Sequence, residues 1–186
     1  MKALEHIRSK QEEWLEKIKP FLLQNNVNVG SGFGFFSRAA QQGGFAMTSL
    51  EVVAHPKAVN KDDLVLYDGN RMPFADGEFD TATAMYVLHH TTNPLVTLGE
   101  MKRVARRRVI LVEELYSGFF SKICLVVVDV FLNYVLFGQH SDIHLGSYFS
   151  RKKFSEAVQA GGWKIIHYQS NSRFGFDTVL CVVERK

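Results

Sequence analysis

The stretch NVGSGFG, residues 28–34, decides the fold because it places glycine at three alternate positions, Gly30, Gly32 and Gly34. Glycine adopts positive φ values and lets the backbone approach a ligand closely. Where a strand meets a helix, free N–H groups and the helix dipole face such a ligand. The stretch therefore predicts a turn between strand and helix, which serves either as a tight turn without a ligand or as a cradle for a nucleotide-like ligand.

Strand-like and helix-like segments alternate on both sides of this turn. Apolar residues at helical spacing predict an N-terminal helix within residues 1–24 that ends near Pro20. Strands are expected at residues 27–29, 45–53, 64–68 (buried), 81–88, 108–114, 163–169 and 178–184, and helices at 35–42, 94–104, 119–137 and 151–160. This alternation predicts the α/β class, with a doubly wound, mostly parallel, Rossmann-like sheet of seven strands in one domain over residues 1–186. The short link before the last strand predicts an antiparallel C-terminal hairpin.

Composition restricts the classes of function. The chain has 186 residues, 46% of them hydrophobic, and a net charge of +3, which is ordinary for a globular protein and gives no reason to expect a nucleic-acid partner. Cys124 and Cys181 form no metal-binding cluster, and the charged N-terminus has no signal core, so we expect a cytoplasmic protein. Residues 119–137 are strongly apolar, but their charge-free run is too short for a membrane span.

Two carboxylates follow the second and third predicted strands. Glu51 ends one strand and can accept hydrogen bonds from ribose hydroxyls, and Asp68 ends the next, beside Gly69, where it can receive an adenine amino group. A nicotinamide-type fingerprint, G-x-G-x-x-G, would need glycine at position 35, which is Phe35. The residues therefore favour an adenosine-shaped crevice over a standard dinucleotide site.

Several motifs stand in a fixed order around this crevice. They are NVGSGFG, TSLE, YDGNRMPFADGEFD, the run from MYVLHHTTNP through LGEMKRVARRRVILVE, and YFSRKKFSEAVQAGGWKII. In order and spacing, these segments resemble the class I S-adenosylmethionine-dependent methyltransferases of the small type 11 kind. The resemblance extends from about Val27 to Trp163.

The resemblance implies roles for particular residues. It assigns contacts with S-adenosylmethionine to Asn28, Gly30, Gly32, Gly34, Glu51, Asp68, Gly69 and Met85. The three glycines would pack against the methionine and ribose portions. Glu51 would bind the ribose hydroxyls, and Asp68 with the Gly69 backbone would recognise adenine. Met85 would lie near the sulfonium.

Two features depart from the family pattern. Asn28 stands where relatives have an acid that helps to hold the cofactor's ammonium group, and the loss of that charge predicts binding weaker by about 1–2 kcal/mol. A proline-glycine-glycine turn before the fifth strand is replaced by a shorter, arginine-rich segment. The basic residues there, Lys102, Arg103, Arg106, Arg107 and Arg108, are expected to form a solvated helix end.

The acceptor side is less defined by the sequence. His89 or His90, after the fourth strand, could act as a general base, although both could equally pack or cap the following helix. Glu113, Glu114 and Tyr116 end the fifth strand and could line the acceptor pocket or only meet solvent. The spacing of His140 and His144 gives only a weak metal motif, so we predict no metal site.

Residues 117–147 come where relatives carry insertions that cover the acceptor. An apolar lid favours a small, partly hydrophobic acceptor, while a core helix or a homodimer face would explain the segment equally well. We predict methyl transfer from S-adenosylmethionine to a small molecule. The alternatives are a methyltransferase-like protein with impaired catalysis, an NAD-dependent oxidoreductase and an interaction module.

Overall fold

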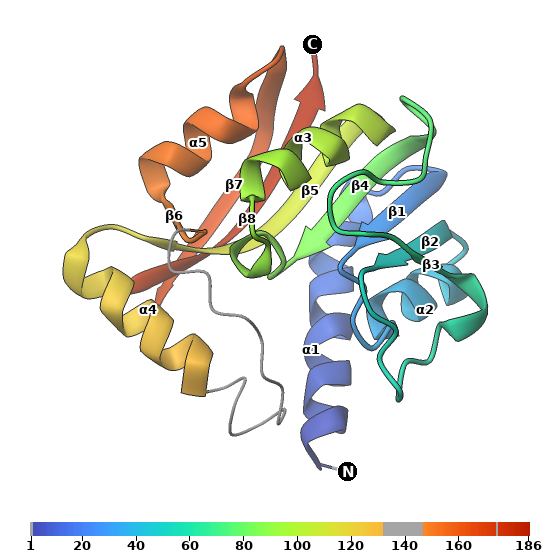
Figure 1. Cartoon of the computed structure of the whole chain (residues 1–186), viewed down its shortest axis with the longest axis horizontal. Coiled ribbons are helices and arrows are strands. Elements are labelled where there is room, and N and C mark those ends of the chain that lie inside the picture. The colour runs from blue at the N-terminus through green and yellow to red at the C-terminus, as the bar shows by residue number, and fades with distance from the viewer. Residues whose placement is uncertain (1, 132–146, 174) are drawn as a thin grey trace. The chain divides into compact units, whose positions relative to one another are not determined.

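The computed structural model describes residues 2–131, 147–173 and 175–186. Its helices and strands alternate along the chain (Figure 1). In order they are α1 (Lys2–Ile18), η1 (Lys19–Phe21), β1 (Asn25–Val29), α2 (Phe35–Gln42), β2 (Ala46–Glu51), η2 (Lys61–Asp63), β3 (Leu64–Leu66), β4 (Phe79–Met85), η3 (Leu88–His90), α3 (Pro94–Val104), β5 (Ala105–Tyr116), α4 (Phe119–Phe131), β6 (Phe149–Ser150), α5 (Arg151–Gln159), β7 (Trp163–Arg173) and β8 (Phe176–Arg185).

The strands form one sheet in the order β3-β2-β1-β4-β5-β8-β7, and the short β6 pairs with β5. β1 runs parallel to both β2 and β4, and β2 runs parallel to β3. β7 and β8 pair antiparallel, as the short link between them requires. This order confirms the predicted Rossmann-like sheet with its antiparallel C-terminal hairpin.

The chain divides into two compact units, residues 1–85 with 99–110 and residues 86–98 with 111–186. In the first unit, α1 packs on α2 and α2 on β2. Ile18, Val27, Phe36 and Leu50 are fully buried there. In the second unit, α5 packs on β7 and α4 packs on β8. Leu125 of α4, Tyr148 and Phe176 of β8 form a buried apolar cluster there. The prediction of one domain stays a prediction.

Some local predictions were wrong in detail. Residues 64–68 were expected as a buried strand, but β3 covers only Leu64–Leu66 and leaves Leu66 54% exposed, because it is the last strand at one edge of the sheet. β4 ends at Met85 and not at Leu88, since Tyr86 adopts a φ of 57°. The predicted link between the last two strands is itself mostly strand.

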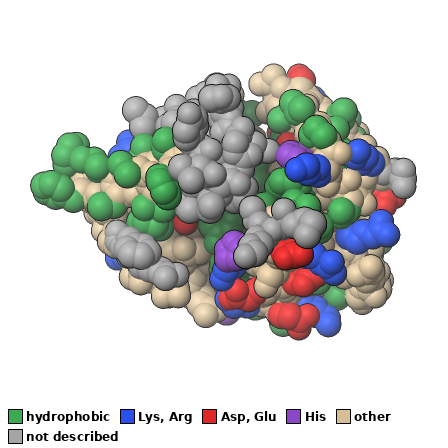
Figure 2. Space-filling view, turned by 90° about the horizontal axis from the view of Figure 1, so that it is seen from below, with side chains coloured by type: hydrophobic (Ala, Val, Ile, Leu, Met, Phe, Trp, Pro, Cys, Tyr) green, Lys and Arg blue, Asp and Glu red, His purple; other side chains and the backbone are tan. Residues whose placement is uncertain are grey.

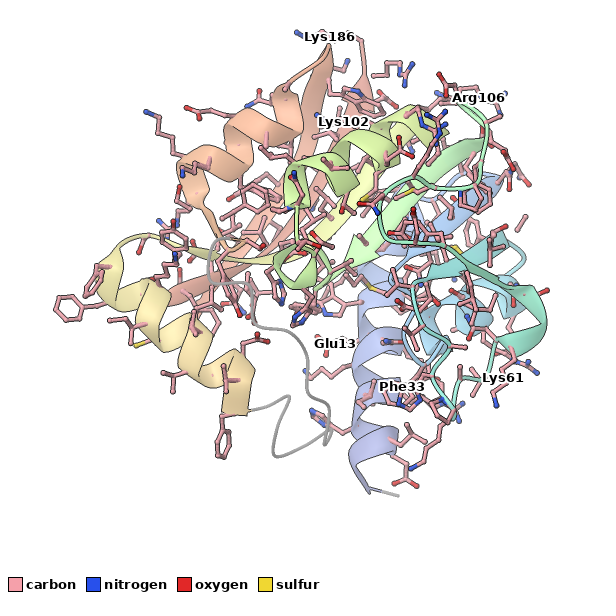
Figure 3. All side chains as sticks on the ribbon, in the orientation of Figure 1. Glu13, Phe33, Lys61, Lys102, Arg106 and Lys186 are labelled. Carbon is pink, nitrogen blue, oxygen red and sulfur yellow. The ribbon has the colours of Figure 1, made fainter. Side chains whose placement is uncertain are left out.

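The basic run is a helix end only in its first two residues. Lys102 and Arg103 lie in the last turn of α3, but α3 passes directly into β5, so Arg106–Arg108 are strand residues. Arg106, labelled in Figure 3, pairs with Asp80 at 2.7 Å, and Arg108 donates to the carbonyl of Phe21 at 3.2 Å. Arg106 and Arg108 therefore make tertiary contacts within the first unit.

Arg103 fastens the loop after β3 to α3. Its guanidinium donates to both carboxylate oxygens of Glu100 at 2.7 Å, to the carbonyls of Phe74 and Met72 at 2.8 and 3.0 Å, and to Asp76 at 2.8 Å. Glu100 in turn accepts the N–H of Met72 at 2.9 Å. Hydrogen bonds from Arg103 hold the pKa of Glu100 below its usual value. The E-x-x-R element of α3 is thus a clamp on residues 72–76.

The apolar segment after β5 is a helix over its described part. α4 leaves Phe119, Phe120, Val127 and Phe131 at least 60% exposed while Leu125 is buried. Figure 2 shows hydrophobic side chains gathered at the left-hand end of the molecule, where α4 lies in Figure 1. Among the described helices, none combines the length and the apolar character that a membrane crossing needs. Residues 132–137 of the predicted helix lie outside the described residues.

Substitution by lysine should destabilise the protein more at Arg103 than at Arg106, because only Arg103 forms the clamp. Arg103→Lys keeps the charge but loses the planar fork, so it should lower the free energy of unfolding by about 2 kcal/mol. Arg106→Lys, at a side chain that is 60% exposed, should lower it by no more than about 0.5 kcal/mol. Urea denaturation of both variants measures the difference, and equal losses would contradict the clamp.

Candidate functional site

The glycine loop is a tight turn fastened to the end of β2. The N–H groups of Gly30 and Ser31 both donate to the carbonyl of Leu50, at 2.9 and 3.2 Å, and the N–H of Gly34 donates to the carbonyl of Ser31 at 2.9 Å. The φ values of Gly30, Gly32 and Gly34 are 67°, 54° and 79°, a region that favours glycine. The sequence correctly predicts the position and the backbone of this turn.

The space beside the loop differs between two of its glycines. A Cβ added to Gly32 would meet no atom within 4 Å, so the backbone there borders open space. A Cβ added to Gly34 would lie 2.1 Å from the side-chain amide of Asn60, which is 3% exposed. Gly32 can therefore face a ligand, whereas Gly34 makes room for Asn60.

The segment that contains Asn60 packs against the glycine loop. Asn60 donates to Ser31 Oγ at 3.4 Å, and the N–H of Val59 donates to the carbonyl of Phe33 at 2.9 Å. The ring of Phe33, labelled in Figure 3, lies 4.1 Å from that of His55 between centroids. Within the described part of the chain, Asn60 Oδ1 is buried without a hydrogen-bond partner. Sequence reasoning missed Asn60, because residues 55–63 resemble only a loop.

Glu51 touches the loop directly. Its Oε2 accepts the N–H of Gly32 at 2.9 Å, and its Oε1 accepts the N–H of Val52 at 2.9 Å. A carboxylate has about four acceptor positions, so these two bonds leave capacity for further donors. The predicted ribose-binding acid therefore lies beside the glycine that borders open space.

Asp68 and Gly69 lie beyond the end of β3 and not in it. Asp68 is exposed and accepts the N–H groups of Asn70 and Arg71 at 2.9 and 3.2 Å through Oδ1. These bonds hold the pKa of Asp68 below its usual value. Gly69 has a φ of 82°, and a Cβ there would lie 3.4 Å from Val52, the residue after Glu51. The turn at Gly69 and the end of β2 are thus neighbours within the first unit.

Asn28 lies inside the first unit. It is 1% exposed, donates to Ser37 Oγ at 3.0 Å, and has Thr83 Oγ1 at 3.3 Å from its own Oδ1. These contacts connect β1 to α2 and β4. The Asn28 amide therefore stabilises the packing of these three elements, which the sequence did not suggest. Its predicted effect on cofactor binding would come from a buried side chain.

Met85 and Tyr86 mark the end of β4. Met85 is the last strand residue and is half-buried. Tyr86 follows with a φ of 57°, which is uncommon for a bulky residue, and its N–H donates to the carbonyl of Val112 at 2.8 Å. Backbone strain of this kind gathers at functional sites. Tyr86 turns the chain from β4 into η3, which contains His89 and His90, the two predicted candidates for a general base.

The second unit contains a buried group of polar side chains around His89. His89 is 2% exposed and its Nδ1 lies 2.7 Å from Glu113 Oε2. Glu113 Oε1 accepts the N–H groups of Val87 and Leu88 at 2.9 and 2.7 Å. Glu113 thus fixes both the backbone of η3 and the orientation of the imidazole.

Asp129 of α4 completes this group. Its Oδ1 lies 3.9 Å from His89 Nε2 and 4.0 Å from His90 Nε2, and its Oδ2 accepts the hydroxyl of Tyr148 at 2.6 Å. The Tyr148 ring stacks on His89 at a centroid distance of 5.3 Å. Sequence reasoning named neither Asp129 nor Tyr148 as a site residue, although a single carboxylate within the apolar run CLVVVDVF is a signal that could have been used.

Burial and the neighbouring carboxylates together shift the pKa values of the group. Burial lowers the pKa of His89, but the charge and hydrogen bond of Glu113, together with Asp129 and Glu114, outweigh burial and raise it to about 8. Burial raises the pKa of Glu114 to about 7. Burial and the bond to Asp129 raise the pKa of the Tyr148 hydroxyl. Glu113 is thus part of the group, whereas Tyr116 packs near Leu125 in the apolar cluster. His140 and His144 lie outside the described residues.

The two glycines of the loop should respond differently to alanine. Gly34→Ala forces a Cβ into the Asn60 amide at an unfavourable φ, so it should lower the free energy of unfolding by about 2–3 kcal/mol. Gly32→Ala adds only the backbone penalty of about 1–2 kcal/mol, because the space beside it is open. Chemical denaturation separates the two, and a smaller loss for Gly34→Ala than for Gly32→Ala would contradict the packing described.

Part of the chain matches the model of a known protein family. Residues 27–112, from β1 into β5, match the family of the methyltransferase domain. This region includes the glycine loop, Glu51, Asp68 and both histidines of η3. Among curated proteins, no sequence matches the chain.

Solved structures share the fold over nearly the whole chain. Magnesium protoporphyrin IX methyltransferase from Synechocystis PCC 6803, solved with bound S-adenosylhomocysteine, is 15% identical with a TM-score of 0.65, over 99% of this chain and 84% of that one. A SAM-dependent methyltransferase from Thermotoga maritima is 14% identical with a TM-score of 0.62, over 99% of both chains.

The fold is also found with another reaction. The [4+2]-cyclase SpnF is 14% identical with a TM-score of 0.67, over 96% of this chain and 80% of that one. At such identities the likeness shows a common fold and no common substrate. Residues 27–112 match the model of the methyltransferase domain family, and the chain shares its fold with solved S-adenosylmethionine-dependent methyltransferases.

Proposed function

We propose that this protein binds S-adenosylmethionine at the glycine loop and transfers its methyl group to a small molecule. The observation that supports this most directly is the hydrogen bond between the Gly32 N–H and Glu51 at 2.9 Å. It sets a carboxylate beside a stretch of backbone that borders open space. A nucleoside that enters this space meets glycine backbone and a ribose-binding acid together.

The residues present fit the adenosine part of the cofactor. Glu51 retains acceptor capacity after its two backbone bonds. Asp68 is exposed; its Oδ1 accepts the N–H groups of Asn70 and Arg71, and its Oδ2 accepts a long bond of 3.4 Å from the Asn70 side chain, which leaves further acceptor positions. A Cβ added to Gly69 would be in van der Waals contact with Val52, so the turn that holds Asp68 lies next to the strand end that holds Glu51. In this proposal Glu51 binds the ribose, and Asp68 with Gly69 binds adenine.

The protein's contribution to methyl transfer is position and exclusion of water. When bound, S-adenosylmethionine supplies a methyl group on a sulfonium that is already activated for in-line displacement. Gly30, Gly32 and the half-buried Met85 would orient the methionine portion, as the family resemblance implies. The chain needs a general base only for an acceptor that must lose a proton.

We expect the acceptor to be small and partly hydrophobic. Residues 117–147 stand where relatives carry insertions over the acceptor, and the described part of that segment, α4, exposes Phe119, Phe120, Val127 and Phe131. Proteins of this fold act on very different small molecules, since one of the similar structures is named for a porphyrin substrate and another for a cyclisation.

A methyltransferase-like protein with impaired catalysis is the second candidate, and Asn28 favours it. Its amide is 1% exposed and satisfied by Ser37 and Thr83. The position therefore serves packing between β1, α2 and β4 without supplying the negative charge that the family pattern has there. Such a protein would bind the cofactor weakly and retain the fold.

Calorimetric titration with S-adenosylmethionine, S-adenosylhomocysteine and NADH tests the proposal. The first two should bind and NADH should not. Glu51→Gln keeps the size of the side chain but removes its charge, so it should weaken S-adenosylmethionine binding about tenfold. Glu16→Gln, on the exposed surface of α1, is the control and should bind as the unaltered chain does. Absence of binding at millimolar ligand, or equal affinity for the Glu51 variant, would refute the assigned site.

Asn28→Asp tests the missing charge. We expect it to tighten S-adenosylmethionine binding by roughly 5- to 30-fold, the equivalent of about 1–2 kcal/mol, while the buried carboxylate lowers the free energy of unfolding. Asn26→Asp is a matched control, because Asn26 is also buried and its amide donates to Leu23 and Ala46. It should destabilise without tightening binding. If the affinity of Asn28→Asp is unchanged, the explanation of this position is wrong.

A further inference from the structure

One side-chain cluster of the second unit has the chemistry of a metal centre. Donor atoms of His89, His90 and Asp129 all lie within 4.8 Å of one another. Asp129 Oδ1 is 3.9 Å from His89 Nε2 and 4.0 Å from His90 Nε2. Both distances exceed hydrogen-bond length. With metal–ligand bonds of about 2.0–2.2 Å, the ligand atoms of a tetrahedral site lie about 3.3–3.6 Å apart, so side-chain rotations must bring these atoms closer when an ion binds. We propose that His89, His90 and Asp129 bind a divalent first-row transition-metal ion.

The partner of His89 supports this assignment. Metal-binding histidines usually donate their second N–H to a carboxylate, which fixes the tautomer and directs the other nitrogen to the ion. Glu113 Oε2 lies 2.7 Å from His89 Nδ1, and Glu113 is itself held by the N–H groups of Val87 and Leu88. His89 Nε2 is thereby set on the side of Asp129.

Asp129 is held in the same manner. Tyr148 donates to Oδ2 at 2.6 Å, and the other oxygen, Oδ1, is the one nearest to both imidazoles. His89 and Asp129 therefore each have a hydrogen-bond partner on the side away from the proposed ion. Asp129 comes from α4 and the histidines come from η3, so the ion would join two elements of the same unit.

The local charge also suits a dication. Glu113 Oε2 lies 2.7 Å from His89 Nδ1 and Asp129 Oδ1 lies 3.9 Å from His89 Nε2, and the His89 side chain is 2% exposed. Two carboxylates so close to a buried side chain are costly unless cations compensate their charge. A divalent ion would compensate two negative charges without any further side chain.

The ligand types indicate which ions would bind. Two imidazoles and one carboxylate suit Zn²⁺, Fe²⁺, Mn²⁺ or Co²⁺, whereas Mg²⁺ and Ca²⁺ prefer oxygen ligands alone. Three protein ligands leave at least one coordination position for water or an oxygen of a small molecule. The assignment revises the prediction that the chain has no metal site, and it gives His89 and His90 the role of ligands in place of a general base.

Zinc titration of the untagged, chelator-treated chain tests the proposal, and it needs neither S-adenosylmethionine nor an acceptor. We expect one equivalent of Zn²⁺ to bind and to raise the unfolding temperature. Co²⁺ should give the visible absorption bands of a four- or five-coordinate site. Absence of saturable Zn²⁺ binding would refute the site whether or not the protein proves to be a methyltransferase.

Variants separate this cluster from other metal-binding residues. Asp129→Asn and His90→Gln should each weaken Zn²⁺ binding at least tenfold, and Tyr148→Phe, which removes only the hydrogen bond to Asp129, should weaken it by roughly 10-fold. His6→Gln, an exposed histidine of α1, is the control and should not change the affinity. Far-UV circular dichroism checks that each variant folds. If Asp129→Asn and Tyr148→Phe fold and bind as tightly as the unaltered chain, or if binding is lost only in His140→Gln with His144→Gln, the assignment is wrong.

Discussion

The carbonyl oxygen of Leu50 accepts the N–H groups of both Gly30 and Ser31, and the proposed cofactor site depends on this contact. Parallel pairing sets Val29 opposite Leu50, so the glycine loop leaves β1 at the point where β2 ends. The next residue, Glu51, then reaches the N–H of Gly32. One register between two strands thus brings together an open glycine backbone and a carboxylate that are 19 residues apart.

A second fastening holds the segment between β3 and β4. This segment has little secondary structure of its own, so its backbone needs external partners. Arg103 satisfies the carbonyls of Met72 and Phe74, and Glu100 satisfies the N–H of Met72. Because both side chains come from one turn of α3, the helix acts as a template for the loop. The arginine-rich junction that follows continues as β5 without a turn.

The second unit has a different chemical character from the first. Its polar cluster is buried, rich in carboxylates and organised by Glu113, whereas the glycine loop of the first unit faces open space at Gly32 with its backbone. Proximity and a dry environment suffice for methyl transfer itself. An arrangement as constrained as His89, Glu113, Asp129 and Tyr148 therefore points to an additional task, such as holding an ion.

The sequence by itself determined the α/β class, the turn at residues 28–34 and the positions of Glu51 and His89 after their strands. These follow from local signals: apolar periodicity, glycine spacing and polar residues at strand ends. Only the tertiary structure decided that Asn60 fills the space at Gly34, that Asn28 bonds to Ser37 and Thr83, and that Asp129 meets His89. Those partners are brought together when elements distant in the chain pack and bury their polar groups, and local patterns of residues do not encode which distant group will arrive.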